Sequence, residues 1–532
     1  MSPFTGTATL IRFMLRRDRI RLPLWIIGIS GFVLLFASSV PGIYPTEADR
    51  QARADLWDTP IANLMRGPGF GLDNYTFGVM VAAEILLYVA TAAALMSVFL
   101  IVRHTRREEE TGRLELIRAN VVGGYAQPAA AMFVVSGAHL AIGALIALLL
   151  PVVGEDMSFT GALAMGAGTA AAGIVFAAIT LAVAQMIEFA RGAASVASLI
   201  VAASFLVRGV GDVQGNVLAW FSPLAWPQQM RPFVDERWWP LLIAAAATVV
   251  FTTIAFSLNS RRDVAAGLVR PKPGHANASD MLANPVGFAF HQLRGSLIGW
   301  SLGLIILGAV FGSTVGEIGE WVADNPELAE FMAAFEGVTV MESFIGFLVL
   351  VMAILTAGFG IPAVLRARSE ETSGHAEALL ATSLGRAQWM GSYLLIAMIG
   401  SAVVLLLGSV SLGILAAVDQ NDTGLFWQII GAALAYVPAI WLLIGLVSLM
   451  FGFLPQALVL PWVVLLYAFV AGVFGDLLNL PSWAYNLSPF EHVPSLPGGE
   501  ITIISLVVVT LLAIGLIVAG VVGFGRRDLQ SV

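Results

Sequence analysis

The chain has 532 residues, of which 58% are hydrophobic and only 12% charged, and its mean hydropathy is +0.86. Soluble domains carry about 25% charged residues, so this composition excludes a soluble globular protein and predicts an integral membrane protein. The sequence contains no cysteine, which excludes disulfides, thiolate metal sites and cysteine nucleophiles.

The N-terminal segment 1–21 has the pattern of an amphipathic helix lying in the membrane interface. Leu10, Phe13 and Met14 are spaced to share one helical face. The cations of the segment are Arg12, Arg16, Arg17, Arg19 and Arg21. Arginines followed by an apolar run also occur in signal peptides, but the counterpart of this run in the second half, 296–313, lies mid-chain, where no signal peptide would lie.

Apolar runs near the roughly 20 residues that cross a bilayer as a helix recur along the rest of the chain. Membrane barrels would instead show short alternating segments. The runs fall at about 22–40, 78–102, 127–152, 159–186, 192–210, 239–258, 296–314, 343–365, 389–417, 427–453, 456–475 and 501–524. The sequence therefore predicts an all-α membrane protein with twelve transmembrane helices, six in each half.

The two halves share anchor motifs at similar spacing, which predicts duplication of one six-helix unit. A charged insert follows the second run of each half. Ser-Pro precedes each sixth run and Arg-Arg-Asp follows it, at Ser222-Pro223, Ser488-Pro489, Arg261-Arg262-Asp263 and Arg526-Arg527-Asp528. Because six crossings is an even number, the two repeats are expected to be parallel. We expect repeats over 22–262 and 286–532, joined by an irregular linker over 263–285.

The net charge of −8 is unevenly spread, and the distribution of the 27 Arg and Lys predicts the orientation. With the N-terminus inside, the cations outside the predicted cytoplasmic segments are Arg50, Arg53, Arg66, Arg208, Arg231 and Arg237. The positive-inside rule then makes both termini, both charged inserts and the linker cytoplasmic.

The charged inserts lie between the second and third runs of each half. The first reads Arg106-Arg-Glu-Glu-Glu-Thr-Gly-Arg-Leu-Glu-Leu-Ile-Arg118, and the second reads Arg366-Ala-Arg-Ser-Glu-Glu-Thr-Ser-Gly-His-Ala-Glu-Ala-Leu-Leu380. In the first, Leu114, Ile117 and Val121 oppose Glu110 and Arg113, which predicts a short amphipathic helix along the membrane. A tight solvated turn is the alternative. Recurrence of Glu-Glu-Thr and Gly-x-x-Glu in two diverged halves favours a contact surface.

This Glu-rich segment followed by Thr-Gly-x-Leu-Glu-Leu-Ile resembles the coupling helix of ABC-2 type exporter permeases, which contacts a separate ATPase. Ser373 intervenes in the second copy, and Ala376 and Ala378 replace leucines, so its contact is expected to be weaker. The resemblance implies ATPase-contact residues Glu109, Glu110, Thr111, Gly112, Leu114, Glu115, Leu116, Glu370, Glu371, Thr372, Gly374, Glu377 and Leu379.

The resemblance extends over essentially the whole chain. The stretches 220–227 and 487–494 occupy the place of short re-entrant external helices in such permeases. The fused twelve-helix, Arg-rich form is most similar to actinobacterial permeases of the tetronasin-resistance type, which export polyketide antibiotics and other drugs. It implies a bacterial cytoplasmic-membrane location, a homodimer of a separate ATPase as partner, and a hydrophobic drug or lipid-like substrate among membrane lipids.

The chain itself shows no sign of catalysis. Its one lysine, Lys272, lies in Arg-Pro-Lys-Pro, so there is no P-loop. The six histidines are scattered without metal spacing, and the Gly-rich tract 161–173 suits close helix packing. We therefore expect no catalytic residue, metal, cofactor or nucleic-acid partner in this chain, with ATP and Mg bound by the partner ATPase.

Few ionisable residues fall within the runs, and such residues are candidates for a translocation path. The candidates are Glu84, Arg208, Asp212 and Asp476. Pairing of Arg208 with Asp212 at i,i+4 is the structural alternative that the spacing favours. His139, alone in an apolar run, is expected to be a packed, hydrogen-bonded histidine rather than a proton relay.

These patterns together favour the permease subunit of an ATP-driven exporter of hydrophobic or amphipathic drugs. A proton-driven twelve-helix secondary transporter is the alternative from another class. It predicts carboxylates at helix centres and a Gly-x-x-x-Asp-Arg-x-Gly-Arg loop, neither of which this sequence has. A permease for lipid-linked cargo, or one that only transmits a signal, remains open.

Overall fold

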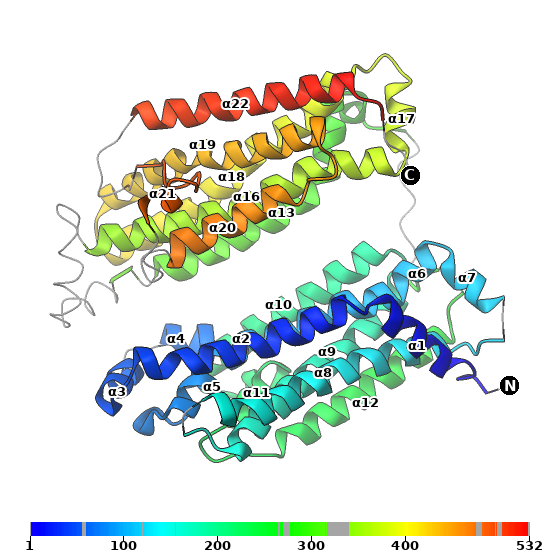
Figure 1. The fold of residues 1–532 in the computed structure, drawn as a ribbon, viewed down its shortest axis with the longest axis vertical. Helices are drawn as coiled ribbons and strands as arrows, with labels where there is room; N and C mark the ends of the chain where they lie inside the picture. The colour runs from blue at the N-terminus through cyan, green and yellow to red at the C-terminus, as the bar shows by residue number, and fades with distance from the viewer. Residues whose placement is uncertain are drawn as a thin grey trace. The chain divides into compact units, whose positions relative to one another are not determined.

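The computed structural model describes residues 2–55, 60–119, 121–154, 156–263, 266–269, 277–313, 315–316, 340–474, 481–494, 496 and 503–529. Every regular element in these ranges is a helix. The chain divides into two compact units, Met1–Gly274 and His275–Val532, which are considered separately (Figure 1).

Unit 1 holds the helices from α1 to α12. Their bounds are α1 (Thr7–Arg17), α2 (Arg21–Ile43), α3 (Glu47–Asp55), α4 (Pro60–Arg66), η1 (Leu72–Asn74), α5 (Phe77–His104), α6 (Arg106–Glu110), α7 (Arg113–Arg118), α8 (Ala126–Val153), α9 (Phe159–Met186), α10 (Ala190–Gln214), η2 (Val217–Phe221), α11 (Ala225–Gln229) and α12 (Pro240–Asn259). The short helices α6 and α7 lie at the same end of the unit as α1, whereas α3 and α4 lie at the opposite end (Figure 1).

Unit 2 holds the remaining helices. Their bounds are η3 (Asp280–Ala283), α13 (Pro285–Gly312), α16 (Val340–Thr372), α17 (His375–Leu380), α18 (Arg386–Asp419), α19 (Thr423–Phe453), α20 (Leu460–Phe474), α21 (Ser482–Tyr485) and α22 (Ile503–Arg526). The short helix α17 lies at the end of the unit where α22 finishes, and α21 lies at the other end (Figure 1).

Among the described residues, eleven helices are long and apolar enough to cross a bilayer. The prediction of a multi-pass helical membrane protein is therefore confirmed. The helix predicted over 456–475 begins only at Leu460, because turns occupy the residues from Pro455 to Val459. As α20 it has 15 described residues, fewer than a span needs.

The short helices expected between the fifth and sixth runs are present in part. In unit 1, the predicted stretch 220–227 takes in the end of η2 and the start of α11, which continues to Gln229. In unit 2, α21 ends before the predicted stretch 487–494, whose described residues form turns.

Each unit is packed around its fourth long helix. In unit 1, α9 contacts α5, α8 and α12, and in unit 2, α19 contacts α16, α18 and α22. Small residues let the backbones approach closely. A Cβ on Gly166 of α9 would lie 2.3 Å from the carbonyl oxygen of Gly143 on α8, and one on Gly173 would lie 2.4 Å from the His139 ring. The tract 161–173 therefore serves helix packing, as its composition predicts.

Substituting Gly166→Ala should separate α8 from α9 and lower the free energy of unfolding by about 1–3 kcal/mol, the usual cost of overpacking. The measurement is thermal unfolding of the purified protein in detergent. Gly28→Ala on α2 is the matched control, because, apart from the neighbouring backbone of its own helix, nothing lies within 4 Å of its Cβ position. It should leave the protein unchanged or slightly stabilised through helix propensity. Equal melting temperatures for the two variants would contradict the close contact.

Candidate functional site

The charged insert of unit 1 forms two short helices that turn away from the end of α5. The first turn is at Thr105, whose backbone leaves the helical region with φ −117° and ψ −86°. The second is at Gly112, between α6 and α7, where φ is +72°. In unit 2, α16 continues without interruption into the insert as far as Thr372. Gly374, with φ +78°, then precedes α17. Such left-handed conformations favour glycine, which has no Cβ to clash.

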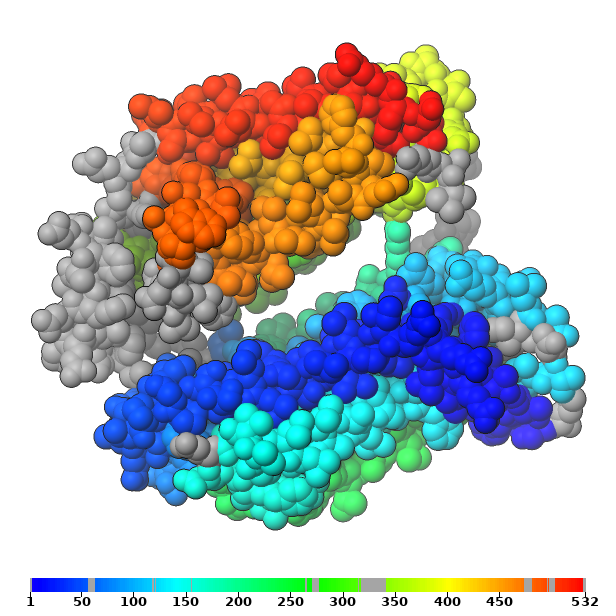
Figure 2. Space-filling model, viewed as in Figure 1, coloured from blue at the N-terminus to red at the C-terminus, as the bar shows by residue number. Residues whose placement is uncertain are grey.

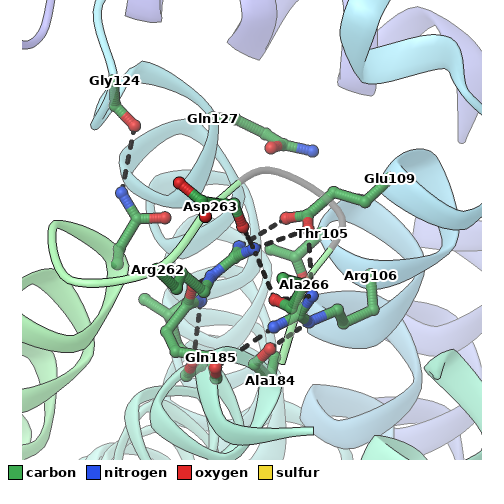
Figure 3. Close-up of polar contacts among 12 residues, drawn as sticks. Thr105, Arg106, Glu109, Gly124, Gln127, Ala184, Gln185, Arg262, Asp263 and Ala266 are labelled. Carbon is green, nitrogen blue, oxygen red and sulfur yellow. Dashed lines mark hydrogen bonds and ion pairs between the residues drawn. The ribbon is translucent and has the colours of Figure 1, made fainter. Parts of the chain in front are cut away.

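A buried ion cluster, Arg106–Glu109–Arg262, holds the first insert in place (Figure 3). The Glu109 carboxylate accepts hydrogen bonds from Arg106 at 3.0 Å and from Arg262 at 2.5 and 2.7 Å. Arg106 also donates to the carbonyls of Ala184, Gln185 and Ala266. All three charged side chains are at most 5% exposed. The cluster therefore joins α6 to the end of α9 and to the segment that follows α12.

Unit 2 contains a cluster of the same composition, Arg368–Glu371–Arg527. Glu371 accepts from Arg368 at 2.8 Å and from Arg527 at 2.6 and 2.8 Å. Arg527 also donates to the carbonyl of Phe451 near the end of α19. The side chains of Glu371 and Arg527 are 1% and 14% exposed. Again the insert is tied to the ends of the fourth and last long helices of its unit.

The clusters show that the two inserts align without an extra residue in the second. Glu109 and Glu371 each lie three residues after a cluster arginine and three before the left-handed glycine. Ser373 therefore matches Thr111, and both hydroxyls donate to carbonyls three and four residues earlier. The interpretation of Ser373 as an intervening residue is wrong, because the fold matches Glu371 with Glu109 rather than with Glu110.

The implied contact residues divide into buried and exposed groups. Those that point inward are Glu109, Leu114, Glu370 and Glu371, so their side chains are not available to a partner. Those that are exposed are Glu110, Thr111, Glu115, Leu116 and Glu377, with Leu116 at 74%. Gly112, Thr372, Gly374 and Leu379 are half-buried. Val121 lies beyond the end of α7 and is 62% exposed, so it does not share the buried side of Leu114.

In unit 1 the N-terminal helix α1 is bound to the same region by ion pairs. Arg17 contacts Glu108 at 2.6 Å, and Asp18 contacts Arg103 at 3.1 Å and His104 at 2.9 Å. Burial raises the pKa of Asp18, but the hydrogen bonds and charges of His104 and Arg103 outweigh it, so this pKa lies below its ordinary value. Of the predicted apolar face, Leu10 and Met14 are buried while Phe13 is 49% exposed.

The candidate path residues that the structure describes are all engaged in ion pairs. Arg208 contacts Asp212 at 2.8 Å and donates to the carbonyls of Asn63 and Leu64, which confirms the predicted pairing. Glu84 accepts from Arg53 at 3.0 and 3.2 Å. Sequence reasoning missed Arg53, which lies 31 residues away on α3. Asp476 lies outside the described residues.

His139 is a packed, hydrogen-bonded histidine, as predicted. Its Nε2 lies 2.6 Å from the Ser97 hydroxyl, which itself donates to the carbonyl of Gly173 at 2.7 Å. Because a hydroxyl has one proton, Nε2–H must be the donor to Ser97. In the part of the chain that the structure describes, no group of His, Asp and Glu side chains is arranged to hold a metal ion.

Comparison with known proteins agrees with this architecture. The family model for the C-terminal domain of the multidrug efflux system permease Rv1217c matches residues 282–525. The multidrug efflux system permease protein Rv1217c of Mycobacterium tuberculosis is 36% identical over 533 residues, which cover 99% of this chain and 96% of that protein. The chain belongs to the Rv1217c permease family. The family-model match takes in α17 and the Arg368–Glu371 part of the second cluster.

For this Rv1217c family member, Glu109→Gln should lower the free energy of unfolding by about 3–5 kcal/mol, because it leaves two arginines without a buried counter-charge. Glu371→Gln should act similarly in unit 2. Thermal unfolding in detergent measures both. Arg107→Gln, at an exposed position of the same helix, is the control and should change stability by less than about 0.5 kcal/mol. A Glu109→Gln variant as stable as the control would show that the cluster is not a structural tie.

Proposed function

We propose that this protein is the permease subunit of an ATP-driven exporter of the ABC-2 type, which moves hydrophobic or amphipathic drug-like molecules out across a bacterial cytoplasmic membrane. The name of its relative, a multidrug efflux system permease, supports the cargo class. The resemblance to permeases of the tetronasin-resistance type supports it further. ATP and Mg would be bound by a homodimer of a separate ATPase, since this chain has no P-loop lysine motif.

The observation that carries the proposal is the pair of exposed segments that are each clamped from within by a buried cluster. A surface that transmits force must not yield when a partner pushes on it. The α6–α7 segment continues from α5, and the cluster on α6 binds it to Arg262, which follows α12, and to the end of α9. In unit 2 the equivalent cluster lies at the end of α16, directly before α17, and binds it to Arg527, which follows α22, and through Arg527 to the end of α19. A displacement of either segment would therefore move three long helices together.

The helix contacts within each unit support the two six-helix repeats of this proposal, which we take to be parallel, with cytoplasmic termini, because six crossings is an even number. Taking α2, α5, α8, α9, α10 and α12 as one series and α13, α16, α18, α19, α20 and α22 as the other, equivalent pairs are in contact. In both units the first helix of the series packs on the third, the second on the fourth, the third on the fourth, and the fourth on the sixth. In this scheme α20 is the eleventh of twelve spans, and the contact segments lie at the cation-rich, cytoplasmic ends.

Ion pairing weighs against the proton-driven alternative. A proton-coupled carboxylate must lose and regain its proton during transport. Glu84 and Asp212 instead face the guanidinium groups of Arg53 and Arg208 at 3.2 Å or less. Both carboxylates therefore have a structural role in an ion pair, which accounts for them without a proton path.

Drug efflux by cells that express this chain distinguishes the energy sources. We expect efflux to stop on ATP depletion and to survive collapse of the proton gradient, and an ATPase subunit to co-purify with the chain. Efflux that needs only the proton gradient, with no associated ATPase, would overturn the proposal. Export of lipid-linked material without drug efflux would be consistent with the ATP-driven mechanism but would change the proposed cargo.

Reversing the charge of an exposed contact residue should weaken the ATPase contact without disturbing the fold. We expect Glu115→Arg, and separately Glu377→Arg, to reduce substrate-stimulated ATP hydrolysis and transport at least about tenfold while membrane expression stays normal. Drug-stimulated ATPase activity of the reconstituted complex is the measurement. Glu47→Arg, an exposed carboxylate at the start of α3, is the matched control. Full coupling in both contact variants would remove these segments from the partner interface.

A further inference from the structure

An apolar groove with a volume of about 380 Å³ opens on the surface of unit 1 beside the short connection between α1 and α2. Both helices pack on α8, and these three helices lie side by side in Figure 1 and on the face shown in Figure 2. The groove is lined on the α8 side by the small residues Gly137, Ala138 and Ala141. Leu15, Ile26 and Phe133 supply apolar walls.

The charged residues that line this groove are Asp18 and Arg19. Two further arginines on α1, Arg12 and Arg16, directly follow the lining residues Ile11 and Leu15. The three arginines are exposed, and no carboxylate among the described residues forms an ion pair with them. The nearby acidic side chains are already engaged, Asp18 by Arg103 and His104 and Glu108 by Arg17. These arginines are therefore available to an anion from outside the chain.

We propose that the groove binds one anionic phospholipid, with its phosphate at Arg16 and Arg19 and one acyl chain along Gly137 and Ala141 of α8. The two parts have different roles. An acyl chain gains little by leaving the bilayer for an equally apolar groove, so the groove supplies position rather than affinity. Guanidinium groups bind phosphate oxygens with charge-assisted, often bidentate hydrogen bonds. The arginines therefore supply the preference for a negatively charged lipid.

A second groove in the protein is comparable with the first but has no cations in its lining. It lies in unit 2, has a volume of about 490 Å³, and is lined by apolar and small residues, including Gly299, Trp300, Gly303 and Leu355, with no charged side chain. Any lipid can fill such a surface, so it should not discriminate between headgroups. It therefore serves as an internal control. The proposal does not depend on the transport function, because it concerns binding alone.

The absence of cysteine allows a site-specific probe in the full-length protein. Ala141→Cys places one fluorophore in the first groove, and Gly303→Cys places one in the second. The purified, delipidated protein is titrated with lipids whose acyl chains carry bromine quenchers, either phosphatidylglycerol or phosphatidylcholine. At Ala141→Cys we expect saturable quenching at a phosphatidylglycerol concentration at least about tenfold lower than that of phosphatidylcholine. At Gly303→Cys the two lipids should quench alike.

Removing the cations tests the headgroup contact. Adding Arg16→Gln or Arg19→Gln to the Ala141→Cys protein should reduce the preference about fivefold each, the effect of about one surface cation on an anionic lipid. Inorganic phosphate at millimolar concentration should not displace the lipid, because it has no acyl chain to hold it in the groove beside the arginines. Equal quenching by both lipids at Ala141→Cys would overturn the proposal, as would a preference that survives both arginine substitutions or recurs at Gly303→Cys. Displacement by phosphate alone would show that the ligand of the site is a free anion and not a lipid.

A count of bound lipids keeps the proposal testable if the fluorophore disturbs the groove. Native mass spectrometry of the unlabelled protein should retain one phosphatidylglycerol that the Arg16→Gln, Arg19→Gln double variant loses. Gly137→Leu should lose it too, because the larger side chain occupies the floor of the groove. Retention of the lipid by both variants would contradict the assigned site.

Discussion

The arrangement of each unit depends on a carboxylate buried between two guanidinium groups. Removing an ion from water costs several kcal/mol, so a buried Glu109 or Glu371 is tolerable only with close counter-charges. Two arginines for one glutamate leave an excess positive charge. The carbonyls of Ala184 and Gln185, in the last turn of α9, accept hydrogen bonds from Arg106, and that of Phe451, in the last turn of α19, accepts one from Arg527. These are the carbonyls that a helix leaves unsatisfied, at its partially negative end, so the helix end and the extra cation satisfy each other.

This compensation explains why the cluster joins several helices at one point. The carboxylate comes from the insert after the second long helix, the second arginine from beyond the sixth, and the carbonyls from the end of the fourth. None of these groups could be buried alone, because each would leave an unpaired charge or acceptor. The helices are thus bound at the end where the charged insert lies, while small residues such as Gly143 and Gly166 let them pack closely along their length.

The sequence predicts the long helices and the position of the inserts because hydrophobicity and charge vary strongly along the chain. It does not predict which of Glu108, Glu109 and Glu110 is buried between arginines, since consecutive residues on a helix point in different directions and the deciding partner, Arg262, lies 153 residues away. The pairing of Glu84 with Arg53 could not be predicted for the same reason, because the two residues lie on different helices. Matching the recurring Glu-Glu-Thr sequence aligns Glu110 with Glu371, whereas the tertiary contacts align Glu109 with Glu371. Local patterns such as Arg208 with Asp212 were predictable because both partners lie on one helix turn.

The two charged inserts are attached to their units in the same way but differ on their exposed side. Each has a buried glutamate, a left-handed glycine and a small or apolar buried residue, Leu114 or Ala376. On the exposed side, Leu116 is matched by Ala378. The buried glutamates beside the clusters also differ in their partners, because Glu108 is bound to the distant Arg17 whereas Glu370 is bound to Arg366 on its own helix. What the segments have in common is therefore the rigid attachment and not the contact chemistry. A partner with two identical faces would therefore meet a larger apolar side chain at Leu116 in unit 1 than at Ala378 in unit 2, on an insert that is anchored in addition to α1 through Arg17.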